Sequence, residues 1–211
     1  MQITSELIAK IHSVLDQGLT LGLGNRKPGE FCVEAAICYA LDLPHSDDPG
    51  CVSAAVRSLK IRLNDSRWSS NKARAEGLRR LAIAQLGSKG AIDDNDFAKR
   101  VARMTIQTVV PQALRSAAKR LTGEHPTKLL ALALKCEEQP TEANAREAKA
   151  DAAAAAAAAY AAYAAYAAAY AAAAADAAAD DPLLATFAEN VVQILIEMKA
   201  PGCAWLERNA V

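Results

Sequence analysis

The alanine-rich segment Ala150–Asp180 constrains the fold more than any other part of this 211-residue chain. It reads ADAAAAAAAAYAAYAAYAAAYAAAAADAAAD, which is alanine throughout apart from four tyrosines and three aspartates. Alanine has the highest intrinsic helix propensity, and the segment contains no glycine, proline or β-branched residue. We therefore predict one long helix over Glu142–Ala179, capped by Thr141, whose alanine face lets a neighbouring helix approach closely.

Helical patterns also fill most of the remaining sequence. Apolar residues recur at helical spacing in segments that begin at a capping residue or a proline and end at a glycine or a proline. The predicted helices are one capped by Thr4 or Ser5, Phe31–Leu43, Pro49–Asn64 with Asp48 as its cap, Ser70–Leu86, one that starts at Asp93 or Asp94 and is kinked or broken at Pro111, Pro126–Cys136, and Pro182–Lys199. The run Gly18–Glu30 is typical of a loop, and no segment reads as a convincing strand. The sequence predicts an all-α fold of about eight helices: a compact N-terminal helical module, and a long Ala/Tyr-rich helix packed with a C-terminal amphipathic helix.

Charge divides the chain into a basic front and an acidic back. Residues 1–135 contain 20 Lys and Arg against 13 Asp and Glu, whereas residues 136–211 contain 4 against 11. We expect a basic helical module over residues 1–136, a linker over 137–141, and the long helix with the C-terminal helix over 142–211. Opposite net charges allow the two parts to attract each other, and the basic module alone can attract an anion.

The cysteines and the N-terminal residues favour a cytoplasmic protein. Five cysteines are an odd number without the spacing of a disulfide framework, and the first ten residues lack the pattern of a signal peptide. Reduced thiols are therefore expected. The alanine-rich segment is long enough to cross a bilayer, but alanine is barely apolar and acidic residues lie at both of its ends, so we predict no membrane span.

A basic run is the strongest candidate for a ligand site. Between Arg57 and Arg80 the chain has eight Lys and Arg against Asp65 and Glu76. Arginine matches phosphate and carboxylate geometry, and a tryptophan offers a face on which a base can stack. The candidate ligand-binding residues are Arg57, Lys60, Arg62, Asn64, Arg67, Trp68 and Arg74. They predict an anionic, nucleotide-like or phosphate-bearing ligand; the alternative is a solvated helix face that pairs with the acidic back half. Nucleic acid is not favoured, because a clear helix-turn-helix signature is missing.

Four tyrosines give the alanine-rich segment a second candidate surface. At 100° per residue they fall on one stripe of the helix, and they are Tyr160, Tyr163, Tyr166 and Tyr170. We expect this stripe to bind the final helix, another copy of the chain or a protein partner, so a homo-oligomer is one expected state. A structural scaffold that acts through this helix is the first alternative function.

Catalytic motifs are weak. The segment Phe31–Arg67 is dense in functional groups, but Cys32, His45, Asp47 and Cys51 do not have the spacing of a known zinc site, so we predict no metal. Phosphate-binding and dinucleotide-binding loops are missing as well, so no cofactor is expected. A hydrolase that uses the region His45–Cys51 is the second alternative function.

The front of the chain resembles a group of uncharacterised bacterial and phage-borne proteins. The resemblance rests on CVEAAICYALDLPHSDDPGCVSAAVRSLKIRLND (Cys32–Asp65): a Cys-Val-x-Glu-Ala helix, a Pro-x-Ser-Asp-x-Pro-x-Cys turn, and an arginine followed by Asn-Asp. It extends over about Phe31–Leu86 and, by composition, over the alanine-rich segment. The resemblance implies a shared fold and transfers no catalytic role.

These observations together favour a non-catalytic binding protein. We expect it to recognise an anionic ligand or a protein partner through its basic module. If the gene is viral, blocking a host defence by sequestering a nucleotide signal or a protein would suit such a chain.

Overall fold

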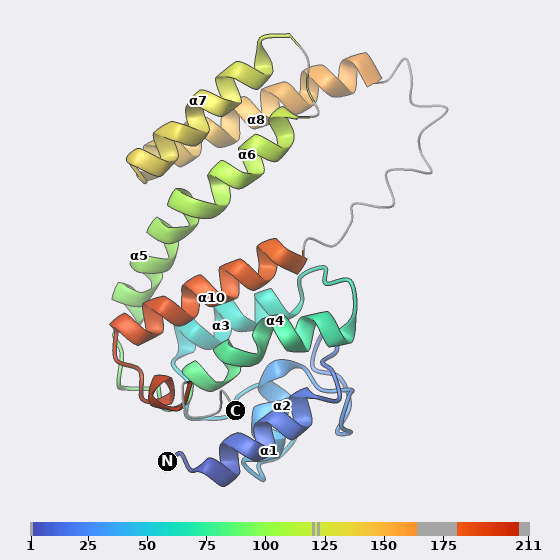
Figure 1. Ribbon diagram of the computed structural model, residues 1–211, viewed down its shortest axis with the longest axis vertical. Helices are drawn as coiled ribbons and strands as arrows, with labels where there is room; N and C mark the ends of the chain where they lie inside the picture. The colour runs from blue at the N-terminus through green and yellow to red at the C-terminus, as the bar shows by residue number, and fades with distance from the viewer. Residues whose placement is uncertain (1, 120, 122, 164–180, 207–211) are drawn as a thin grey trace. The chain divides into compact units, whose positions relative to one another are not determined.

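The computed structural model of the chain is all-α (Figure 1). It describes residues 2–119, 121, 123–163 and 181–206, and of residue 116 and residues 153–163 it describes the backbone alone. Within these ranges every regular element is a helix, and the one β-type contact is an isolated bridge between Gly24 and Phe31. The predicted fold class is confirmed. None of the helices in the described ranges is long and apolar enough for a membrane span.

The helices group into two compact units, one made of Met1–Arg100 with Ala179–Val211 and the other of Val101–Ala178. The described helices of the first unit are α1 (Ser5–Leu15), α2 (Val33–Ala40), α3 (Ala54–Asn64), α4 (Asn71–Ala84), most of α5 (Asp94–Met104), α10 (Asp181–Glu197) and the 3₁₀ helix η2 (Pro201–Trp205). Those of the second unit are the end of α5, the π-helical turn η1 (Thr105–Val109), α6 (Val110–Ala118), α7 (His125–Glu138) and α8 (Glu142–Tyr163). The second unit is therefore an insertion between α5 and α10 of the first.

This division differs from the predicted one. The predicted linker 137–141 is the turn between α7 and α8, inside the second unit. The C-terminal helix α10 instead packs on α4 of the first unit (Figure 1). Polar contacts add to this packing: the Asp181 carboxylate accepts hydrogen bonds from the backbone and hydroxyl of Ser69, and Arg80 lies 2.7 Å from Glu189. The charge boundary does not mark the unit boundary, because the apolar stripe of α10 determines where it docks.

Two helices start later than predicted. The third predicted helix was placed at Pro49 with Asp48 as its cap, but α3 begins at Ala54, and the Ser53 hydroxyl caps it by accepting from the Val56 amide at 3.3 Å. The residues before it cannot be helical, because Gly50 has a φ of +70°. The second predicted helix loses its first residues in the same way, since the Cys32 sulfur caps α2 by accepting from Ala35.

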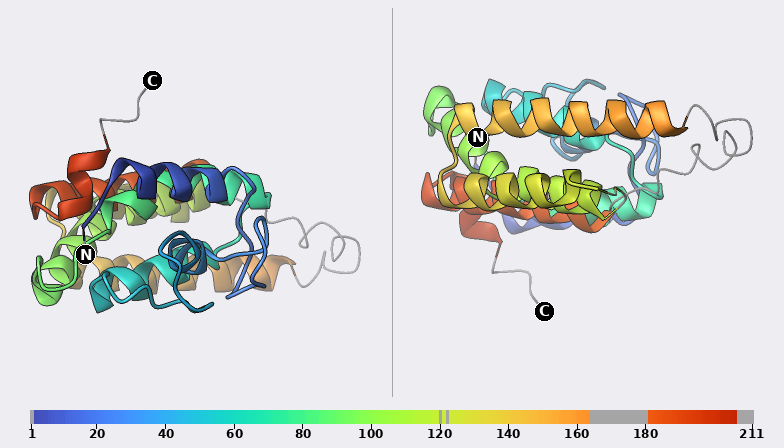
Figure 2. Two further views of the ribbon diagram at one scale, coloured as in Figure 1. Left: turned by 90° about the horizontal axis from the view of Figure 1, so that it is seen from below. Right: turned by 90° about the horizontal axis from the view of Figure 1, so that it is seen from above.

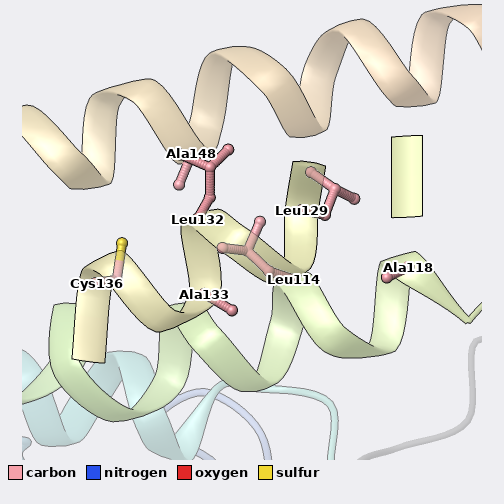
Figure 3. Close-up of a cluster of buried hydrophobic side chains, with 7 residues drawn as sticks. All are labelled: Leu114, Ala118, Leu129, Leu132, Ala133, Cys136 and Ala148. Carbon is pink, nitrogen blue, oxygen red and sulfur yellow. The ribbon is translucent and has the colours of Figure 1, made fainter. Parts of the chain in front are cut away.

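The second unit has a small core of leucine and alanine side chains (Figure 3). The buried residues of this core come from α6, α7 and α8, and they are Leu114, Ala118, Leu129, Leu132, Ala133, Cys136 and Ala148. The helices α7 and α8 lie side by side (Figure 1 and Figure 2). Ala148 contributes only a methyl group to this core, and the close approach predicted for the alanine face of the segment Ala150–Asp180 stays a prediction.

The break predicted at Pro111 is visible as a change of helix type. The turn Thr105–Val109 is π-helical, and Pro111 lies in the first turn of α6. A proline removes one backbone donor and its ring crowds the preceding turn, which a wider turn accommodates. At the start of α8, the Thr141 hydroxyl accepts from the Asn144 amide at 3.2 Å, so the predicted cap is confirmed. The predicted continuation of this helix from residue 164 to 179 lies outside the described residues.

Candidate functional site

The predicted ligand-binding residues separate into a buried set and an exposed set. Lys60, Asn64, Trp68 and Arg74 are buried, with at most 6% of each residue exposed. Arg57 is partly buried, and its side chain lies 2.5 Å from Asp47. Arg62 and Arg67 are exposed. The four buried residues do not present a ligand-binding surface to solvent, and each of them has an internal structural role.

Asn64 joins three parts of the first unit. Its side-chain oxygen accepts from the Val33 amide at 3.1 Å, and its side-chain nitrogen donates to the Thr20 carbonyl at 3.0 Å and to Asp65 at 2.9 Å. The Val33 amide is in the first turn of α2 and so has no partner within its own helix. Asn64 therefore fixes the start of α2 and the Gly-rich loop against the end of α3.

Arg74 strengthens the same junction from α4. Its Nε donates to the Asn64 carbonyl at 2.8 Å, and one terminal nitrogen donates to the Leu19 carbonyl and to the Asn71 side chain, each at 2.9 Å. A guanidinium with its donors held by carbonyl groups is occupied in maintaining the fold. We conclude that Arg74 is a structural residue.

Trp68 does not offer a stacking face. Its indole nitrogen donates to the Leu63 carbonyl at 2.9 Å, and only 6% of the residue is exposed. The ring lies directly on Gly77 of α4, where an added Cβ would come within 2.4 Å of Trp68 Cη2. A glycine inside a predicted helix costs stability unless a neighbour needs the space. The glycine at position 77 therefore indicates, in the sequence itself, that a bulky side chain packs against this helix.

Lys60 forms a fully buried ion pair that the sequence did not reveal. Its Nζ lies 3.3 Å from Glu34 Oε1, and both side chains have no exposed surface. Glu34 Oε2 accepts from the Gln85 side chain at 3.0 Å. The cluster therefore links α3 to α2 and to the end of α4 within the core of the first unit.

The electrostatics of this pair are those of charges removed from water. Burial raises the pKa of Glu34 and lowers the pKa of Lys60, while the attraction between the two charges opposes both changes. Three atoms of the cluster have no hydrogen-bond partner in the structure: Glu34 Oε1, Lys60 Nζ and Gln85 Oε1. Within this cluster each charge depends on the other for compensation.

In the region proposed for hydrolysis, His45 and Arg57 contact the backbone of neighbouring turns, and Cys51 is partly buried. His45 Nε2 lies 3.1 Å from the Gly24 carbonyl, and its ring packs near Phe31 with centroids 6.0 Å apart. Burial raises the pKa of Cys51, which disfavours the reactive thiolate. The turn itself is held by Arg57, which donates to the Asp47 carbonyl and carboxylate. Among the described residues, no group of three or more His, Cys, Asp or Glu is placed to hold a metal ion.

An exposed surface lies where the Gly-rich loop meets the connection between α3 and α4. The Gly22 amide donates to Asp65 at 2.9 Å, and the Leu19 amide donates to the Asn71 carbonyl at 3.0 Å. These bonds place the loop beside the end of α3, where exposed arginines occur. We call this region the loop–corner surface, and it consists of Leu21, Leu23, Arg26, Arg62 and Arg67. The two leucines, which are 60% and 43% exposed, were not part of the predicted site.

The loop that carries these leucines is held in one conformation. The Thr20 amide donates to the Phe31 carbonyl at 2.8 Å, and the Asn25 amide donates to the Glu30 carbonyl at 2.8 Å. Gly24 has a φ of +70°, and an added Cβ would lie 1.8 Å from the Glu30 carbonyl oxygen. Only glycine fits at this close approach, so the loop presents its leucines on a fixed backbone.

The tyrosine stripe is described only in part. Tyr160 and Tyr163 belong to α8, of which the backbone is described at these positions. Tyr166 and Tyr170 lie outside the described residues. Their assignment to a partner-binding face stays a prediction.

The buried ion pair makes a specific prediction for stability. Lys60→Met leaves the Glu34 charge buried without compensation, so we expect the free energy of unfolding to fall by about 3–5 kcal/mol. Glu34→Gln combined with Lys60→Met removes both charges and should recover most of this loss. Urea denaturation at neutral pH measures the free energy of unfolding of the single and the double variant. The control is Lys72→Met, because Lys72 is exposed and its Nζ lies 4.0 Å from Glu76. A Lys60→Met variant as stable as this control contradicts the assignment of Lys60 to a buried ion pair.

A second prediction concerns His12, which joins α1 to α4. Its Nδ1 lies 3.1 Å from an Arg79 nitrogen, and Arg79 also lies 2.5 Å from Asp16. Burial, followed by the Arg79 charge, lowers the pKa of His12, and Asp16 opposes the change. Since the unfolded chain binds the proton more readily, this histidine should destabilise the fold as the pH falls below its unfolded value of about 6.5. His12→Gln should flatten the pH dependence of the unfolding midpoint between about pH 7 and 5; an unchanged slope contradicts the prediction.

Comparison with known proteins does not assign this chain to a family. No family model, no curated protein and no solved structure matches the chain. The resemblance seen in the sequence therefore stays a prediction. The structure does explain several residues that carry it, because Cys32 caps α2, Glu34 pairs with Lys60, and Asn64 binds the loop.

Proposed function

We propose that this chain is a non-catalytic binding protein whose first unit recognises an anionic partner through the loop–corner surface. The observation that carries the proposal is that two exposed arginines, Arg62 and Arg67, flank in the sequence Asp65, which anchors the loop. Arginine side chains at such a position can form paired hydrogen bonds with a carboxylate or a phosphate group.

The other cations of the basic run support this choice of surface. Several of them form ion pairs within the first unit: Arg57 with Asp47, Arg79 with Asp16, and Arg80 with Glu189. These ion pairs agree with the alternative interpretation of the basic run Arg57–Arg80, in which its side chains are solvated or pair with acidic residues. On exposure alone, the anion-binding proposal is narrowed from the seven predicted residues to Arg62 and Arg67, since the other five are buried or partly buried.

Two further observations guide the choice of ligand class in the proposal. A nucleotide was expected to stack on Trp68, and the burial of this side chain removes that support. The raised pKa of Cys51 likewise gives no support to a cysteine nucleophile. We therefore favour a partner recognised by its carboxylate or phosphate groups. We place this function in the cytoplasm, which the five free cysteines favour.

Charge reversal tests the proposal. Purified protein is titrated with two polyanions, polyglutamate and heparin, at low and moderate salt. We expect binding that weakens with salt, and a loss of about tenfold or more in Arg62→Glu combined with Arg67→Glu. The matched control is Lys89→Glu combined with Lys99→Glu, which changes the net charge equally at two other exposed positions of the first unit.

The outcomes separate clearly. A loss in the arginine variant and not in the lysine variant supports recognition at the loop–corner surface. Equal losses in both variants would show attraction by net charge alone, and that result rejects the proposed site. Absence of polyanion binding by the unaltered protein also rejects it.

A further inference from the structure

The two leucines at the tip of the Gly-rich loop need an explanation that anion binding does not supply. Leu21 is 60% exposed and Leu23 is 43% exposed, although the chain buries most of its other large apolar side chains in the first unit. Single exposed leucines are common on protein surfaces. Here two of them flank Gly22 on a loop whose backbone is fixed by hydrogen bonds to Asp65 and to Phe31.

A fixed backbone changes what these leucines can do. The loop is joined to the core through Asn64, which donates to the Thr20 carbonyl, and through Arg74, which donates to the Leu19 carbonyl. A loop whose backbone is already fixed loses less conformational entropy on binding than a loop that must first become ordered. The loop therefore has the properties of a pre-organised apolar anchor next to a cationic region.

The charges around the leucines distinguish between classes of partner. The arginines Arg26, Arg62 and Arg67 are exposed, but so is Asp65, and Glu30 is partly exposed beside Lys27. Acidic groups among the cations weaken the attraction of this surface for the dense negative charge of a lipid bilayer or a nucleic acid, so that binding by charge alone is expected only at low salt. The surface complements a protein segment, in which apolar side chains and carboxylates alternate over short distances.

We infer that the loop–corner surface binds a protein segment that presents apolar side chains to Leu21 and Leu23 and carboxylates to Arg62 and Arg67. This inference rests on the proposed function and names the class of its partner. The apolar contacts supply burial of surface from water, and the arginines fix the orientation of the segment by pairing with its carboxylates.

The experiment uses the full chain as bait for a library of random linear peptides displayed on phage. Selected peptides are synthesised, and their dissociation constants are measured by fluorescence anisotropy. We expect the selected sequences to combine Asp or Glu with Leu, Ile or Phe. Leu21→Ser combined with Leu23→Ser should weaken their binding by about tenfold or more. Because both side chains are exposed, thermal unfolding of this variant should match that of the unaltered protein.

The chain provides a matched control for the leucine variant. Leu130 and Leu134 are 44% and 54% exposed on α7 of the second unit, so Leu130→Ser combined with Leu134→Ser removes the same amount of apolar side chain elsewhere. Peptide binding should be unchanged in this control. Arg62→Glu combined with Arg67→Glu is measured in parallel.

Each outcome decides the inference. Loss of binding in both the leucine and the arginine variants supports it. Loss in the arginine variant alone overturns it but leaves the proposed function in place, whereas unchanged binding in both variants overturns the two together. Sedimentation with phosphatidylserine-containing vesicles forms a separate arm: vesicle binding that depends on Leu21 and Leu23, without selection of acidic peptides, overturns the inference in favour of a lipid surface.

Discussion

The first unit depends on the hydrogen bonds that converge on Asn64. This residue ends α3, binds the first turn of α2 through Val33, holds the Gly-rich loop through Thr20, and receives Arg74 of α4 at its backbone carbonyl. A buried amide whose donors and acceptor are satisfied specifies one arrangement of the elements around it, because any other arrangement leaves polar groups without partners. The buried pair of Glu34 and Lys60 and the docking of Trp68 on Gly77 join the same helices, α2, α3 and α4, elsewhere in the unit.

This arrangement explains why a basic run in the sequence does not become a basic surface. Some of its polar residues are structural: Lys60 compensates Glu34, and Arg74 donates to backbone carbonyls. Others form ion pairs near the surface, as Arg79 does with Asp16. Few arginines stay exposed near the loop, and in the proposed function they act together with the exposed Leu21 and Leu23. The hydrogen bonds from Asn64 and Asp65 to the loop therefore also fix the backbone of the proposed binding surface.

Helix content was predictable from local sequence, whereas the partners of the helices were not. Propensity and capping located most helices and the Thr141 cap, because these effects act within one turn. The start of α3 was misplaced because the positive φ of Gly50 depends on the whole turn. The partners of Lys60 and Trp68 are far away in sequence or on another helix, so hydrophobic periodicity does not identify them. The available signals were Glu34 within the otherwise apolar segment 31–41 and the glycine at position 77. The docking of α10 on α4 is a long-range contact of the same kind.

Hydrogen exchange of the Val33 amide, followed by NMR, tests the central role of Asn64 most directly. An amide in the first turn of a helix normally exchanges quickly, because it has no partner within the helix. If Asn64 holds this group as described, the Val33 amide exchanges as slowly as that of Leu81, which is fully buried in α4, and the Leu19 amide is protected with it. Exchange of Val33 at the rate of an exposed loop amide such as that of Gly90 would contradict the account.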